Sequence, residues 1–162
     1  MQARTLKAVM IALIYFLTAL PPVWASSPID PVLQAEHAPA GVVFEIATGK
    51  SDSLNWALPQ VKTYIAQLRK RFPKLPIAVV THGREMFALQ NSQADAAAPT
   101  HSLTQQLVKD GVALHVCGTN ATRKGLSEED FPEYVNVAAA GPAQINDYVA
   151  MGYLRIQIKK PE

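Results

Sequence analysis

The sequence has 162 residues, of which 49% are hydrophobic and 17% are charged, so it encodes a folded chain rather than a disordered one. This length fits one domain with a sizeable core. The formal net charge is +2, and the single cysteine excludes an intrachain disulfide, a cysteine-rich zinc site and a Cys-x-x-Cys redox pair.

The first 25 residues have the pattern of a cleavable export signal. Arg4 and Lys7 precede an uncharged apolar run over 8–20, two prolines follow it, and Ala25 provides a small residue for cleavage. The apolar run has 13 residues, whereas a helix that spans a bilayer needs about 20. The pattern therefore predicts a periplasmic or secreted protein without a stable membrane anchor, and an uncleaved anchor is the alternative.

Removal of the signal changes the charge balance. The segment 1–25 carries two basic side chains and no acidic one, which leaves 13 basic and 13 acidic side chains in the mature chain. A neutral chain offers no electrostatic reason to expect nucleic acid or an anionic membrane as a partner. Residues 26–40 contain three prolines and no clear periodicity, which predicts a flexible leader before a single domain over 41–162.

Apolar runs typical of strands alternate with helical patterns along this domain. Apolar residues at alternating spacings of four and three predict one face of a helix over 54–72. Further helices are expected around 103–108, from 119 toward 125, and over 141–152, and residues 90–99 are expected to form an exposed loop or lid. Strands are predicted over 42–47, 77–80, 112–116, 134–139 and 153–158.

This order of elements indicates an α/β fold with a mostly parallel five-stranded sheet covered by helices on both faces. The polar alternation in 153–158 predicts a less buried edge strand or a subunit contact. Ser127 and Asp130 have the spacing of a capping box with aspartate in the last position, which predicts a turn of helix there.

The candidate site residues follow two neighbouring strands. Because parallel sheets bind and react at the carboxyl ends of their strands, His82 and Cys117 are expected to meet there. Cys117 precedes Gly118 and a helix start, where backbone N–H groups stabilise a thiolate. A cysteine and histidine pair can activate the thiol for nucleophilic chemistry. A buried, inert cysteine is the alternative interpretation.

His115 lies two residues before Cys117, so both side chains point to the same side of a strand. A packed core histidine is at least as good an interpretation of His115 as a catalytic partner. Cys117 with His82 or His115, completed by a third ligand, would suit a soft metal such as copper. The preferred prediction contains no metal and no cofactor.

Several segments resemble the DsrE/DsrF-like (YchN-like) family, and the similarity extends over 42–160. The most specific are the Cys-Gly segment after "GV-apolar-apolar-His" and the final "GP…GY" pattern. The matching segments are Val80-Thr81-His82-Gly83, 107–111, His115-Val116-Cys117-Gly118-Thr119-Asn120, Asp130, 135–137, Ala140-Gly141-Pro142 and 151–156. The resemblance implies a three-layer α/β/α fold that assembles into trimers or hexamers.

The same resemblance implies sulfur transfer, with Cys117 carrying a persulfide between donor and acceptor proteins. The leading hypothesis is therefore an exported homo-oligomeric sulfur carrier in which His82 is a nearby polar partner of Cys117. Two alternatives remain at this point. One is a non-catalytic binding or assembly protein with a packed Cys117, and the other is a copper-binding protein.

Overall fold

The computed structural model describes residues 27–160, and the expected export signal over 1–25 lies outside this range. Five strands form one sheet in the order β4-β3-β2-β1-β5. Their bounds are β1 (Gly41–Ile46), β2 (Ile77–Thr81), β3 (Val112–Cys117), β4 (Asn136–Ala138) and β5 (Tyr153–Gln157). All four pairings are parallel, which confirms the predicted α/β sheet.

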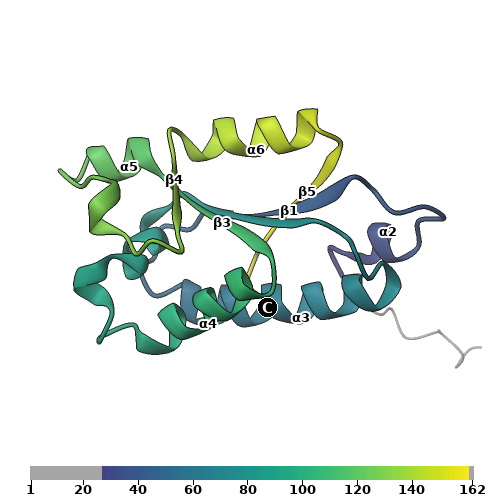
Figure 1. The fold of residues 1–162 in the computed structure, drawn as a ribbon, viewed down its shortest axis with the longest axis horizontal. Helices are drawn as coiled ribbons and strands as arrows, with labels where there is room; N and C mark the ends of the chain where they lie inside the picture. The colour runs from purple at the N-terminus through teal and green to yellow at the C-terminus, as the bar shows by residue number, and fades with distance from the viewer. Residues whose placement is uncertain (1–26, 161–162) are drawn as a thin grey trace, which may run out of the picture.

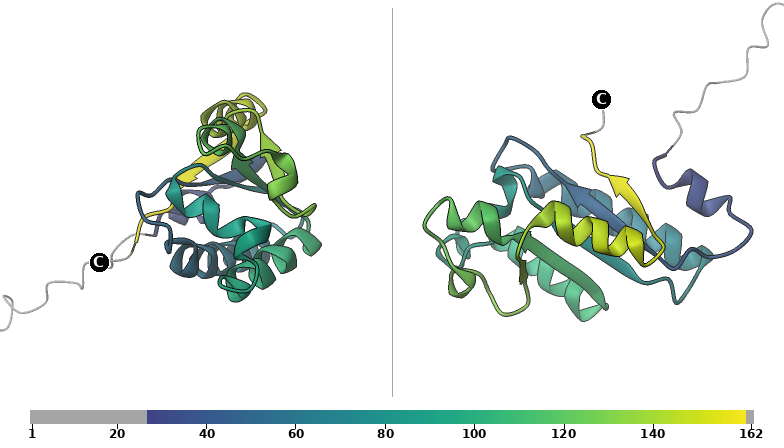
Figure 2. Two further views of the ribbon diagram at one scale, coloured as in Figure 1. Left: turned by 90° about the vertical axis from the view of Figure 1, so that its left-hand side faces the viewer. Right: turned by 90° about the horizontal axis from the view of Figure 1, so that it is seen from above.

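Helices cover both faces of this sheet, as parallel strands require. Figure 1 shows α3 (Leu54–Arg71) and α4 (Ala98–Lys109) on one face, and α5 (Gly118–Thr122) and α6 (Gly141–Ala150) on the other. The left-hand view of Figure 2 shows the same three layers, and the right-hand view, from above, shows α6 lying along the sheet. In the described part of the chain, three 3-10 turns lie at Arg84–Leu89, Asn91–Gln93 and Glu128–Asp130.

The two faces of the sheet have cores of different size. Alternate residues of β1 point to opposite faces, so Phe44 joins the large cluster beneath α3 and α4, whereas Val43 joins a small one beneath α6. The small cluster is completed by Ala78, Val80 and Ile145. Because few apolar side chains fill the α6 side, that face leaves room for polar side chains at the strand ends.

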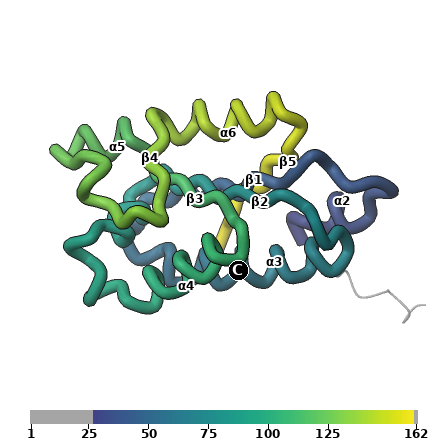
Figure 3. Tube along the Cα trace, viewed as in Figure 1, coloured from purple at the N-terminus to yellow at the C-terminus, as the bar shows by residue number. Residues whose placement is uncertain are grey.

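The two ends of the domain differ in how well the sequence predicts them. β5 lies at the edge of the sheet beside β1, as its polar alternation predicts, and Figure 3 shows the chain returning to that position. The segment 27–40 differs from the expected flexible leader. It contains α2 (Asp30–Leu33), and the side chains of Ile29 and Val32 are buried in the large core cluster.

Other differences concern the bounds of elements. Helix α4 begins at Ala98, so the expected loop over 90–99 contains a 3-10 turn and the start of that helix. Strand β4 is shorter than predicted because residues before Asn136 form a turn.

The predicted capping box is present, with Ser127 and Asp130 bonded reciprocally. Among residues 27–160, no helix is long and apolar enough to cross a membrane.

Candidate functional site

The structure brings Cys117 and His82 together at the carboxyl edge of the sheet. Cys117 ends β3, and His82 follows the last residue of β2, whose partner in the register is Val116. Both side chains lie against Gly141, the first residue of α6. A Cβ atom placed on Gly141 would lie 2.5 Å from Cβ of His82 and 3.3 Å from Cβ of Cys117. The site is therefore a close three-way contact between β2, β3 and α6.

Cys117 is enclosed by the starts of two helices. It is the N-cap residue of α5, and the backbone of Gly141 at the start of α6 lies against it. The residue is only 5% exposed and belongs to the large core cluster. Backbone N–H groups at helix starts favour a negative charge nearby, but a nearly closed site restricts which molecules can reach the sulfur.

His82 is held by a buried carboxylate from the neighbouring strand. Its Nε2 atom lies 2.8 Å from Oε1 of Glu45 in β1, and the Glu45 side chain is only 5% exposed. The other carboxylate oxygen accepts a 2.8 Å hydrogen bond from Nε of Arg155 in β5. Glu45 thus joins His82, whose side chain is 17% exposed, to an arginine that is 49% exposed at the sheet edge.

These two partners decide the charge state of Glu45. Burial raises the pKa of its carboxyl group, but the hydrogen bonds from His82 and Arg155, helped by the charges of both groups, bring the pKa below its ordinary value. Glu45 is therefore an ionised carboxylate at neutral pH, and an ionised carboxylate only accepts hydrogen bonds.

The backbone around His82 is also fixed. Its carbonyl oxygen accepts a hydrogen bond from Nδ2 of Asn120 in α5. The next residue, Gly83, donates its N–H to the fully buried carboxylate of Glu85 at 2.8 Å. Glu85 also accepts hydrogen bonds from the hydroxyl groups of Thr48 and Thr81. These contacts leave the His82 backbone little freedom.

His115 takes part in a different contact. Its Nε2 atom lies 2.9 Å from the hydroxyl of Tyr148 in α6, and burial lowers the pKa of His115. Burial and the neighbouring Tyr153 raise the pKa of Tyr148. His115 is a packed histidine with a hydrogen-bond partner.

Within residues 27–160, no group of three or more His, Cys, Asp and Glu side chains is arranged to hold a metal ion, so a third ligand for copper is missing there.

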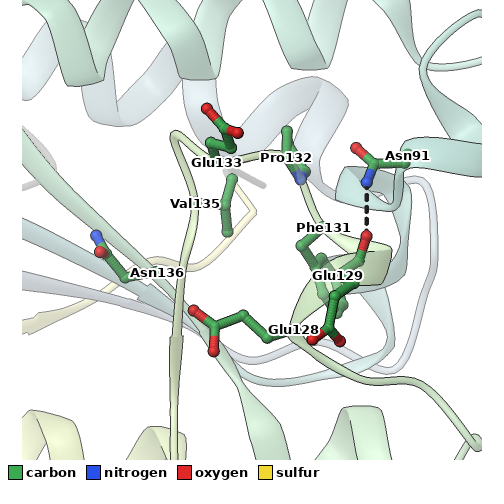
Figure 4. Close-up of a pocket in the computed structure, with 8 residues that line it drawn as sticks. All are labelled: Asn91, Glu128, Glu129, Phe131, Pro132, Glu133, Val135 and Asn136. Carbon is green, nitrogen blue, oxygen red and sulfur yellow. Dashed lines mark hydrogen bonds between the residues drawn. The ribbon is translucent and has the colours of Figure 1, made fainter.

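A separate cavity of about 620 Å³ lies beside β4. Its lining includes Glu128, Glu129 and Glu133 (Figure 4). Asn91 closes one side by donating a hydrogen bond from Nδ2 to the carbonyl oxygen of Glu129. Neither Cys117 nor His82 lines this cavity, so its acidic surface is separate from the thiol site.

Sequence reasoning missed three residues of the site, namely Glu45, Arg155 and Gly141. Glu45 was visible as a charged residue within the apolar run of β1, which is unusual for a strand buried on both faces. Its partners were not visible, because Arg155 is 110 positions and His82 37 positions away in the sequence. Only the strand order β2-β1-β5 makes Glu45 the neighbour of both.

Comparisons with known proteins agree on the fold. A sequence model of the DsrE/DsrF-like family matches residues 47–158. A structure titled as a protein of unknown function, MTH1491 from Methanobacterium thermoautotrophicum, superposes with a TM-score of 0.58 at 22% identity, covering 72% of this chain and 97% of the other. The ychN protein from E. coli superposes with a TM-score of 0.54 at 13% identity, covering 73% and 99%. No curated protein matches the sequence.

Proposed function

The chain belongs to the DsrE/DsrF-like family, and on that basis we propose that it is a sulfur carrier that uses Cys117 as its thiol or persulfide site. The observation that supports this most is the position of Cys117. The single cysteine of the chain lies at the carboxyl edge of a parallel sheet, at the starts of α5 and α6 and beside His82. Such edges are where α/β folds place their chemistry.

The transfer step is an exchange between sulfur atoms. The Cys117 thiolate attacks the outer sulfur of a donor persulfide, R–S–SH, and a new S–S bond forms on Cys117 as the donor S–S bond breaks. The donor leaves as a thiolate and takes up the proton that Cys117 released. The products are a Cys117 persulfide and a donor thiol, so no external oxidant or reductant is consumed. The reverse exchange passes the sulfur to an acceptor thiol.

In this proposal His82 receives the proton of Cys117 through one water molecule, because no hydrogen bond joins the two side chains. His82 follows the end of β2, beside the end of β3 where Cys117 lies, and the two residues share the contact with Gly141. The small exposed fraction of Cys117 favours a donor whose reactive end is narrow, because an approach from solvent is nearly closed in the single chain.

The same burial supports a second candidate function. A cysteine that is 5% exposed and packed in the core is the common structural use of this residue. The chain would then be a non-catalytic binding or assembly protein. Access to the Cys117 sulfur distinguishes the two candidates.

The remaining parts of the proposal concern location and assembly. Export to the periplasm or the outside is supported by the pattern over 1–25. A homo-oligomer, a trimer or hexamer, is what the family resemblance implies, and donor and acceptor proteins would have to be present in the same compartment. Exposed apolar residues at the end of α6 and on the edge strand, namely Val149, Met151 and Leu154, support a subunit contact there.

The direct test is intact mass spectrometry of the purified chain after incubation with glutathione persulfide. We expect a gain of about 32 Da, the mass of one sulfur atom, that is located on Cys117 and removed by dithiothreitol. The Cys117→Ser variant should gain nothing. His82→Gln should take up sulfur more slowly at neutral pH. The matched control is His115→Gln, in the neighbouring strand β3, which should take up sulfur at the wild-type rate. A folded wild type that gains no sulfur refutes the carrier function and favours the packed cysteine.

A further inference from the structure

Glu45 is a buried charged residue at this edge that the sulfur exchange does not use directly. Its side chain is buried between two cationic or potentially cationic groups, His82 and Arg155, and lies in a strand that is otherwise apolar. A buried carboxylate is costly to desolvate unless it is fully paired. An ion pair of this kind beside a candidate nucleophile calls for a functional interpretation as well as a structural one.

We infer that Glu45 is a positioning residue that fixes the orientation and the tautomer of His82, so that Nδ1 of His82 is the atom that receives the Cys117 proton. This inference rests on the proposed use of Cys117 as a reactive thiol. It deepens that proposal by naming a residue that acts through His82 and does not itself touch the sulfur.

The tautomer follows from the hydrogen bond. The 2.8 Å distance between Nε2 of His82 and Oε1 of Glu45 is a hydrogen-bond distance. Because the ionised carboxylate has no proton to donate, Nε2 must carry the hydrogen. In a neutral imidazole the other nitrogen, Nδ1, is then the acceptor. Within residues 27–160, no hydrogen bond joins Nδ1 of His82 to another group, Cys117 included, so in the neutral ring the lone pair of Nδ1 has no partner.

The orientation follows from the strand order. β2 lies between β1 and β3, so His82 has Glu45 on one side and Cys117 on the other. The far end of the ring, Nε2, is held at Glu45. Nδ1 is two bonds from Cβ, the atom that shares the contact at Gly141 with Cys117. The carboxylate therefore holds the ring by the nitrogen that is not needed for the proton transfer.

Arg155 completes the arrangement from the outside. Its guanidinium donates from both Nε and Nη2 to the same oxygen of Glu45, Oε2, and leaves Oε1 for His82. Each carboxylate oxygen therefore has its own partner. The pairing with Arg155 also helps to keep Glu45 ionised, and hence an acceptor only, which is the condition that fixes the tautomer.

The experiment measures the rate of Cys117 alkylation by iodoacetamide from about pH 6 to about pH 10 in the full chain, for the wild type and Glu45→Gln. At about pH 7 only a few per cent of an ordinary thiol is ionised, so a base can accelerate alkylation. A positioned base contributes about 100-fold or more, and because Glu45→Gln leaves His82 in place, we expect a partial loss of about 10-fold. The two rates should converge above about pH 9, where the thiol ionises without help. A carboxylate with a purely structural role would leave the profile unchanged.

A second readout is the ¹⁵N spectrum of His82, assigned with His82→Gln. The wild type should show the Nε2–H tautomer, and Glu45→Gln, whose amide can donate as well as accept, should show a larger fraction of the Nδ1–H form. Glu133→Gln is the control, because it neutralises a carboxylate that lines the separate cavity beside β4, which neither His82 nor Cys117 lines. It should leave both readouts at wild-type values.

If Glu45→Gln does not fold, Glu45→Asp retains the charge and shortens the reach, and it should give a smaller change in the same direction. Identical alkylation profiles for folded Glu45 variants and wild type overturn the inference, as does an Nδ1–H tautomer in the wild type. A wild type whose thiol is alkylated as predicted but takes no sulfur from glutathione persulfide refutes the carrier function and leaves the role of Glu45 intact. The two failures are therefore distinguishable.

Discussion

The substitution Gly141→Ala tests the contact on which the site is built. Glycine to alanine at a helical position ordinarily stabilises a protein by up to about 1 kcal/mol, because glycine loses more backbone entropy on folding. At Gly141 we expect the opposite sign. The new Cβ would lie 2.5 Å from Cβ of His82 and 3.3 Å from Cβ of Cys117.

The size of the effect follows from these distances. Two carbon atoms in contact prefer a separation of about 3.5 Å or more, so the first pair must move apart by about 1 Å. The atom in the way is a Cβ, which is fixed to the backbone and cannot rotate aside, and the His82 backbone is itself held by Asn120 and the Gly83 contact. Overpacking of this kind costs about 1–3 kcal/mol.

The assay is urea unfolding followed by circular dichroism, with Gly49→Ala as the matched control, because a Cβ on Gly49 meets nothing within 4 Å. We expect Gly141→Ala to lower the free energy of unfolding by about 1–3 kcal/mol and Tm by about 2–4 °C per kcal/mol. Gly49→Ala should change it by less than about 0.5 kcal/mol. The penalty should shrink in a His82→Gly background, which removes the opposing Cβ.

A Gly141→Ala variant that is as stable as the wild type would refute this reasoning. A penalty that is the same in the His82→Gly background would locate the cost in the helix backbone instead of the three-way contact.

Two further predictions concern stability. Phe44→Ala removes a fully buried ring beneath α3, and we expect the free energy of unfolding in urea to fall by about 3–5 kcal/mol; a loss below about 1 kcal/mol would contradict this account of the core. The second prediction concerns the loss of stability at acid pH. Burial raises the pKa of Glu45, but the hydrogen bonds with His82 and Arg155 bring this pKa below the ordinary 4.5. The ionised carboxylate therefore contributes to the free energy of unfolding above about pH 4.5. This contribution is lost as the pH falls through the lower pKa of the folded state. The difference in unfolding free energy between wild type and Glu45→Gln should therefore shrink below about pH 4.5, and a constant difference from pH 6 to pH 3 would contradict the assignment.

Local patterns predicted most of the elements because their causes are local. The alternating spacing of apolar residues placed the helix that the structure has at Leu54–Arg71, and the polar alternation of 153–158 placed β5 at the edge. The segment around Ile29 and Val32 is predicted as a flexible leader because the cause of its packing is not local. Its three prolines obscure any periodicity, and the apolar surface that buries these two residues is supplied by distant parts of the chain.

The sequence by itself determined the parallel α/β sheet and the placement of His82 and Cys117 at neighbouring strand ends, because hydrophobic periodicity and turn residues act over a few positions. Only the tertiary structure decided that Gly141 closes the site and that Glu45 is shared by His82 and Arg155. Those contacts join residues far apart in the chain, and the order of strands in the sheet, which no local pattern encodes, makes them neighbours.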